Sequence, residues 1–87
     1  MSRIKWTPEK IAAKLRAVIA EELGLDDHAV TPDSHIVNDL GANSLDCVEL
    51  IMRCEDVFKI EIDDDDTERL IYVRDLSKYL AKRLVAL

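Results

Sequence analysis

The chain has 87 residues with a formal net charge of −6, and 48% of its residues are hydrophobic. This length allows one small domain with a modest core, so we expect residues 1–87 to form a single domain with a short N-terminal extension over residues 1–6. With only two glycines and two prolines, the composition suits a helix-rich globular chain and excludes a disordered one.

No apolar run approaches the roughly 20 residues that a membrane-spanning helix needs. The N-terminus is charged but has no apolar stretch behind it, so it lacks the pattern of a signal peptide. We therefore expect a cytoplasmic protein without a membrane span.

The charge is concentrated in the middle of the chain, where residues 43–70 hold ten acidic and three basic side chains. This acidic stretch argues against nucleic acid as a partner and favours protein partners with basic surfaces. The two cysteines, Cys47 and Cys54, would lie about 10 Å apart on one helix, which is too far for a disulfide. Without a Cys-x-x-Cys motif or clustered histidines, no metal site is expected.

A first helix is predicted to begin at Thr7-Pro8, with Thr7 as the N-cap and Pro8 at the first helical position. Gly24 predicts its C-cap. Trp6 is expected to make a staple-like contact near Lys10 or Ile11. The apolar stripe of this helix consists of Ile11, Leu15, Val18, Ile19 and Leu23.

A long loop is predicted from Leu25 to Asn38, because turn-forming Asp, Asn, Thr and Pro residues recur along it. Its two histidines are isolated from other ligand-type residues, so a solvated or capping role is expected for them. We expect the loop to be held to the core by Val30, Ile36 and Leu40.

A second helix is predicted from about Ser44 to Phe58. Asn43 is a good N-cap residue, and Asp46 can return a hydrogen bond to it as a short capping box. Ser44 then occupies the first helical position, where its hydroxyl is not needed for the cap and can face solvent. A phosphate on that hydroxyl would lie at the positive end of the helix.

The second helix has two apolar surfaces. The inward stripe is predicted to comprise Leu50, Ile51, Cys54 and Phe58, with Leu45 close to it. Val48 and Met52 form a second ridge that shares its surface with the carboxylates of Asp46, Glu49, Glu55 and Asp56. Such a ridge suits docking onto a basic, partly apolar partner, but periodicity alone favours rim packing equally.

The last third of the chain completes an all-α fold. Residues 59–62 read as an extended connector anchored by Ile60 and Ile62, and residues 63–68 open a short third helix. Their aspartates do not match a calcium loop, which requires a glycine at its sixth position and a closing glutamate. A last helix is expected from about Arg74 to Ala86. The predicted architecture is a small up-down bundle of three main helices plus one short helix, with a long loop between the first two main helices.

The block from Leu40 to Asp46, together with residues 48–52, Phe58, residues 60–62 and residues 64–66, resembles the type II acyl carrier proteins. The resemblance extends from about residue 11 to residue 80. It implies one acyl-carrier-like domain, a monomer, whose Ser44 receives 4'-phosphopantetheine from coenzyme A through a phosphopantetheinyl transferase, with Asn43 and Leu45 beside it. The thiol of that arm would carry acyl thioesters between enzymes of fatty-acid, polyketide or a related lipid pathway. The resemblance also favours docking by the surface made of Asp46, Val48, Glu49, Met52, Glu55 and Asp56.

Several residues depart from the family pattern and predict a specialised carrier. Asn43 replaces the usual aspartate before the serine, which keeps the cap but removes a charge. Two alternatives remain open: a carrier of aminoacyl or peptidyl groups, and a carrier-like interaction module that works unmodified. A self-contained enzyme is not expected, because Ser44 has no identifiable histidine partner. The other departures are Cys47, Arg53, Lys59, Asp63, Tyr72 and the N-terminal extension.

Overall fold

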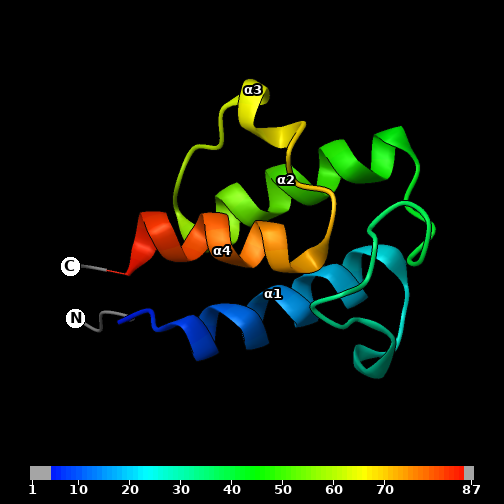
Figure 1. Ribbon diagram of the computed structural model, residues 1–87, viewed down its shortest axis with the longest axis horizontal. Helices are drawn as coiled ribbons and strands as arrows, with labels where there is room; N and C mark the ends of the chain where they lie inside the picture. Colours follow the sequence, from blue (N-terminus) through cyan, green and yellow to red (C-terminus); the bar gives the residue numbers. More distant parts are fainter. Residues whose placement is uncertain (1–4, 86–87) are drawn as a thin grey trace.

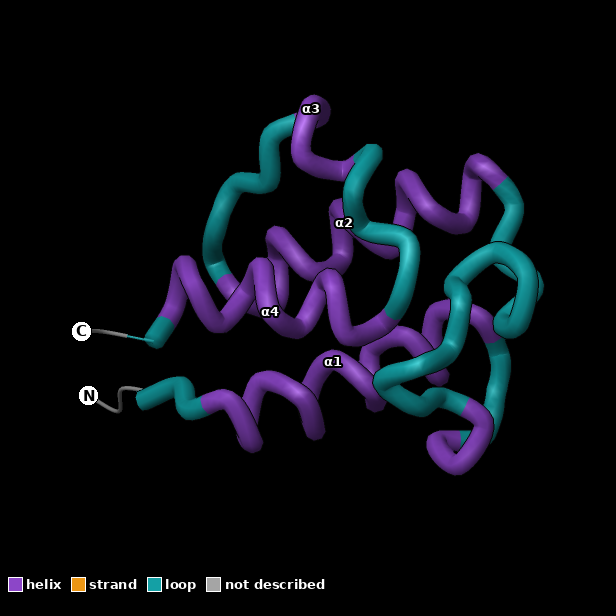
Figure 2. The backbone as a smooth tube through the Cα atoms, viewed as in Figure 1, coloured by secondary structure: helices purple, strands orange, loops and turns teal. Residues whose placement is uncertain are grey.

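The computed structural model describes residues 5–85, which form a bundle of helices (Figure 1). The elements are α1 (Pro8–Leu23), the 3-10 turn η1 (Asp27–Ala29), α2 (Ser44–Phe58), α3 (Asp64–Thr67) and α4 (Val73–Leu84). This order confirms the predicted all-α fold with a long connection between its first two main helices (Figure 2). Residues 1–4 of the predicted extension, and the predicted helix end at Ala86, lie outside the described residues.

The boundaries of α1 follow from its caps. The Thr7 hydroxyl accepts a hydrogen bond from the Lys10 N–H at 3.2 Å, and Pro8 opens the helix. At the other end Gly24 adopts a left-handed φ of 68° and donates its N–H to the Ala20 carbonyl. Both predicted caps are therefore confirmed, and α1 ends where the sequence indicated.

The helix α4 begins one residue earlier than expected. Its N-cap is Tyr72, whose side chain makes no cap hydrogen bond. The Asp75 carboxylate instead accepts the N–H groups of Tyr72 at 2.9 Å and Ile71 at 3.2 Å. This carboxylate satisfies two backbone donors ahead of the helix and compensates for the missing cap side chain.

Helix α1 packs against both α2 and α4. It runs antiparallel to α4, so the start of α1 and the end of α4 lie at the same side of the molecule (Figure 1). The predicted loop anchors Val30, Ile36 and Leu40 are all buried, and they attach the α1–α2 connection to the core. None of the helices among residues 5–85 is long and apolar enough to cross a membrane.

The positions of two side chains go beyond the prediction or differ from it. Trp6 packs its ring against Phe58 at the end of α2, with ring centroids 4.8 Å apart, a contact that the sequence did not predict. Leu45 is 65% exposed and not part of the inward stripe. It lies five positions before Leu50, which places it about 140° around the helix axis from that buried residue.

None of the four residues of helix α3 is buried, and polar contacts join this helix and the residue Ile62 before it to the long helices. The Tyr79 hydroxyl on α4 donates to Asp66 at 2.8 Å, and Glu55 on α2 accepts the Ile62 N–H at 2.8 Å just before α3 begins. Ile62 is buried, as expected for an anchor of the connector. These contacts hold α3 across the open side of the bundle.

Candidate functional site

A hydrogen-bonded turn fixes the chain just before α2. Gly41 has a φ of 77°, a left-handed conformation that glycine adopts without a Cβ penalty. Its N–H donates to the Val37 carbonyl at 3.0 Å, and the Ala42 N–H donates to Ile36 at 3.2 Å. The turn therefore delivers Asn43 to the start of α2 in a defined position.

Asn43 and Asp46 form the predicted capping box. The Asp46 N–H donates to Asn43 Oδ1 at 2.8 Å, and the Asn43 N–H donates to Asp46 Oδ2 at 3.0 Å. Ser44 is the first residue of α2 and is exposed, and its hydroxyl makes no hydrogen bond within residues 5–85. Because Asn43 performs the capping, the Ser44 hydroxyl is free for chemistry at the positive end of the helix.

His35 has a structural role in the α1–α2 loop. Its Nδ1 accepts the Asn38 N–H at 3.0 Å, and its ring packs edge-on against Tyr72 with centroids 5.2 Å apart. In the part of the chain that the structure describes, no histidine hydrogen-bonds Ser44. The geometry therefore gives Ser44 no general base of its own, in contrast to a hydrolase triad.

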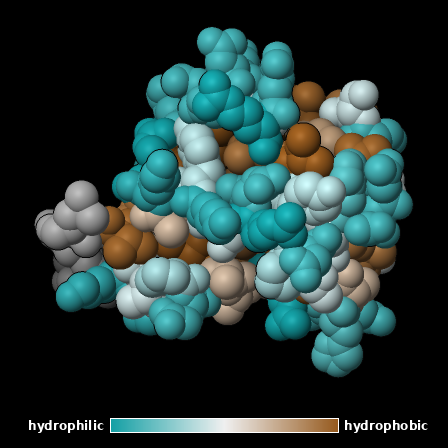
Figure 3. All heavy atoms as spheres, viewed as in Figure 1, coloured by the Kyte–Doolittle hydropathy of each residue, from teal (hydrophilic) through white to brown (hydrophobic). Residues whose placement is uncertain are grey.

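Three large apolar side chains are exposed within residues 44–52 of α2: Leu45 at 65%, Val48 at 55% and Met52 at 60%. Hydrophobic atoms gather over this part of α2, beside the hydrophilic surface of α3 (Figure 3). Glu49 and Asp56 are exposed as well, whereas Asp46 and Glu55 are half-buried and hydrogen-bonded to backbone N–H groups. Four of the predicted docking residues are therefore exposed: Val48, Glu49, Met52 and Asp56. The other two, Asp46 and Glu55, also stabilise the fold through their hydrogen bonds to the backbone.

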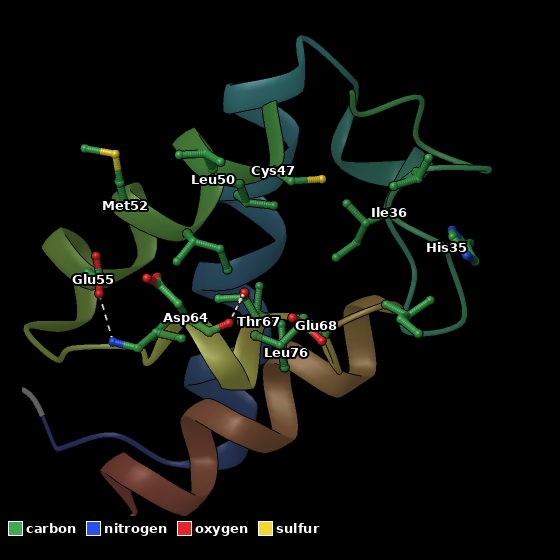
Figure 4. Close-up of a pocket in the computed structure, with 16 residues that line it drawn as sticks. His35, Ile36, Cys47, Leu50, Met52, Glu55, Asp64, Thr67, Glu68 and Leu76 are labelled. Carbon is green, nitrogen blue, oxygen red and sulfur yellow. Dashed lines mark hydrogen bonds between the residues drawn. The ribbon is translucent and has the colours of Figure 1, made fainter. Parts of the chain in front are cut away.

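A cavity of about 560 Å³ opens between α2, the loop around Ile36 and residues 62–71 (Figure 4). Its floor is apolar and includes Leu50 and Leu76, both fully buried, while carboxylates of Glu55, Asp64 and Glu68 lie on its lining. The cavity was not predicted from the sequence. Helical periodicity carries no signal for it, because much of the lining comes from residues 35–37 and 62–71, which lie outside the three long helices.

Both cysteines are free thiols. Cys47 is half-buried and lines the cavity, and its pKa is raised by burial and then by the nearby Asp46 carboxylate. Cys54 is buried in the core, and burial raises its pKa to about 12. Neither thiol is activated as a nucleophile, because both pKa values lie above the ordinary range.

Comparison with known proteins decides the family. The sequence model of one protein family, described as "Phosphopantetheine attachment site", matches residues 13–80 of this chain. The chain belongs to the acyl carrier protein family. Membership makes it a carrier of acyl groups rather than a catalyst, with 4'-phosphopantetheine as its covalent cofactor.

Three relatives, each named "Acyl carrier protein", support this membership of the acyl carrier protein family. That of Syntrophobacter fumaroxidans is 47% identical over 84% of this chain and 90% of its own length. That of Karelsulcia muelleri is 47% identical over 86% of this chain and 90% of its own. That of Desulforapulum autotrophicum is 49% identical over 84% of this chain and 96% of its own.

The start of α2 fits the phosphodiester of a phosphopantetheine group. The Ser44 hydroxyl is exposed, and the N–H groups of the first helical turn create a positive end that favours a phosphate. The nearest carboxylate, Asp46, is hydrogen-bonded to the backbone at Asn43. Residues 43–45 can therefore hold the negative charge that this acyl carrier protein cofactor brings.

Proposed function

We propose that Ser44 is the residue that bears the 4'-phosphopantetheine arm, with Asn43 and Leu45 as its immediate neighbours. The observation that carries the proposal is the free, exposed Ser44 hydroxyl beside a completed capping box. When bound, the arm supplies a thiol that holds acyl groups as thioesters. The chain's own contribution is to present Ser44 rigidly and to stabilise the phosphate charge at the start of α2.

We propose further that α2 is the docking surface for phosphopantetheinyl transferase and for acyl-handling enzymes with basic surfaces. Exposed Val48 and Met52 provide apolar contacts, and the surrounding carboxylates steer a basic partner into place. The proposed docking residues are Asp46, Val48, Glu49, Met52, Glu55 and Asp56.

We also propose that the cavity behind α2 binds the acyl chain and shields it from solvent. Cys47 and Val48 line it and lie on the turn of α2 that follows Ser44. Its apolar floor suits a hydrocarbon chain, since burial of each methylene contributes about 0.8 kcal/mol. We propose fatty-acid, polyketide or a related specialised lipid pathway as the context. The single domain over residues 1–87, the monomeric state and the cytoplasmic location stay predictions.

The test is the intact mass of the chain after incubation with coenzyme A and a broad-specificity phosphopantetheinyl transferase. We expect the parent to gain one phosphopantetheine group and a Ser44→Ala variant to gain none. Loading of the Ser44→Ala variant would overturn the assignment of Ser44. Failure of the folded parent to load, with a transferase active on a control carrier, would favour an unmodified interaction module.

A second variant addresses the departure at Asn43. Asn43→Asp keeps the side-chain acceptor for the Asp46 N–H and restores the charge that the family usually has there. We expect it to load faster than the parent, because the added carboxylate attracts a basic transferase. Equal loading rates for the parent and Asn43→Asp would show that a charge at residue 43 does not affect recognition by the transferase.

A further inference from the structure

A second hollow has no residue of α2 in its lining. It is a groove of about 510 Å³ between α1, the start of α4 and residues 30–32, and it shares no lining residue with the cavity behind α2. Its floor contains the buried side chains of Leu15, Val30 and Val73. Small side chains flank this floor, namely Ala12 and Ala13 on α1 and Ser77 on α4.

The two hollows carry opposite charge. Three carboxylates line the cavity behind α2. The α1–α4 groove is lined instead by Arg16, Arg74 and Lys78, with no carboxylate among its lining residues. A positive groove in a chain of net charge −6 is a local feature that bulk composition does not explain.

The three cations of the groove are available to a partner. Arg16 uses Nε to donate to the Val30 carbonyl at 3.2 Å, which leaves its terminal nitrogens for other acceptors. Arg74 lies over the Tyr72 ring, 4.5 Å from its centroid, and pairs at 2.8 Å with Asp33. The Asp33 side chain is 89% exposed, and such a surface ion pair is readily exchanged. Lys78 is exposed and makes no salt bridge within residues 5–85.

We infer that this groove is a second docking surface, which binds an acidic amphipathic helix of a partner protein. The apolar floor and small flanking side chains accept the apolar stripe of a helix, and the three cations pair with its carboxylates. A concave groove between two helices fits an inserted helix better than a flat anionic membrane. Because the groove lining contains neither Ser44 nor any other residue of α2, we expect that both surfaces can be occupied at once.

The test uses a synthetic amphipathic peptide of about five helical turns with a leucine stripe and glutamates elsewhere. A matched peptide carries lysines in place of the glutamates. Titration of the isotope-labelled chain is followed by NMR, and we expect the glutamate peptide to shift the amide signals of Ala12, Ala13 and Lys78. Equal binding of the lysine peptide, or shifts confined to α2, would overturn the inference.

Matched variants separate charge from shape. Lys78→Glu should weaken peptide binding roughly fivefold, whereas Lys82→Glu on the same helix but outside the groove lining should have less effect. Ala13→Trp should block the groove, whereas Ala17→Trp, exposed on α1 beyond the lining, should not. Retained binding by folded Ala13→Trp would refute the groove as the site.

Two further controls define the partner and the independence of the surface. Ser44→Ala should bind the peptide as the parent does, so failure of the carrier assignment and failure of this inference remain distinguishable. Vesicles of phosphatidylglycerol and phosphatidylcholine provide the membrane alternative. If the parent bound these vesicles but not the glutamate peptide, and Lys78→Glu lost the vesicle binding, the partner would be an anionic membrane. That result would overturn the inference.

Discussion

At the start of α2, one residue caps the helix and the next presents a free hydroxyl. Asn43 provides the acceptor that closes the first helical turn, and Ser44 keeps its hydroxyl free. A serine that also capped the helix would have its oxygen engaged by a backbone N–H. The residue before the serine therefore matters for the accessibility of Ser44 as much as for the stability of α2.

The cap contribution of Asn43 can be measured. Asn43→Ala removes the acceptor of the Asp46 N–H and should lower the free energy of unfolding by about 1 kcal/mol. Asn43→Asp retains an acceptor and should stay within about 0.5 kcal/mol of the parent. Urea denaturation followed by circular dichroism compares the three chains. Parent-like stability of Asn43→Ala would mean that the capping box contributes little.

The buried thiol of Cys54 predicts a loss of stability at high pH. Its pKa rises from 9.0 to about 12 on folding, so the unfolded chain ionises first as the pH increases. The stabilising effect is complete below pH 9 and is lost as the pH rises through about 12. At one unit above the unfolded pKa, the loss should be about 1.4 kcal/mol.

A Cys54→Ser variant isolates this effect, because a serine hydroxyl does not titrate in this range. The difference in unfolding free energy between parent and variant should shrink by about 1.4 kcal/mol from pH 7 to pH 10. Urea denaturation at the two pH values measures it. A constant difference would contradict preferential ionisation of the unfolded Cys54.

At the level of elements, Glu55 joins α2 to the segment before α3. Its carboxylate accepts the N–H of Ile62, a buried residue. Glu55→Ala should therefore cost about 1–3 kcal/mol, because a backbone donor loses its charged acceptor. Glu49→Ala removes the same charge from an exposed position of the same helix and should change stability by less than about 0.5 kcal/mol.

This pair of variants also separates docking from folding in α2. Amide hydrogen exchange should accelerate around Ile62 in Glu55→Ala but not in Glu49→Ala, because the lost contact opens the connector locally. If Glu55→Ala binds a partner enzyme more weakly, the exchange data then show how much of the loss comes from local opening of the connector and not from a lost docking contact. Unchanged exchange at Ile62 would show that the Glu55 contact does not hold this connector.

Helix ends that depend on nearby residues were predicted from the sequence, whereas contacts between distant segments were not. The start of α1 at Thr7-Pro8, its end at Gly24 and the capping box of α2 were predicted correctly, because each depends on residues within one helical turn. The contact of Trp6 with Phe58 was missed, because it joins distant parts of the chain. The bond between Tyr79 and Asp66 was missed for the same reason.

At the candidate site too, local features could be predicted and features built from distant segments could not. The free Ser44 hydroxyl and the capping role of Asn43 follow from local sequence. The cavity and the basic groove do not, since the cavity is assembled from four separate segments and the groove from three. The exposure of Leu45 was predictable from its angle around the helix, although the prediction placed this residue close to the inward stripe.

Over the whole molecule, charge is separated between the helices. Residues 43–70, which include α2 and α3, carry ten acidic and three basic side chains. The ion pairs of Arg53 with Glu21 and Glu22 connect α2 to α1 and offset part of the repulsion. These pairs are at least partly exposed, so each contributes at most about 1 kcal/mol.

This charge distribution predicts that salt stabilises the fold. Added sodium chloride screens the repulsion among the acidic residues 43–70 and also weakens the Arg53 pairs, but the excess of acidic charge makes repulsion the larger effect. A gain of roughly 1 kcal/mol would raise the melting temperature by about 4–8 °C for a domain of this size. Magnesium should act at lower concentration, since a divalent ion bound to the folded acidic surface stabilises it by mass action.

A double variant, Asp64→Asn with Asp65→Asn, provides the control for the salt effect. Both residues are exposed in the first turn of α3, so their neutralisation removes repulsion without opening the core. The variant should show a smaller rise in melting temperature with salt than the parent. A melting temperature that falls with salt in the parent would instead mean that the Arg53 pairs outweigh the repulsion within residues 43–70. An equal rise in parent and variant would place the repulsion elsewhere, on the carboxylates of α2.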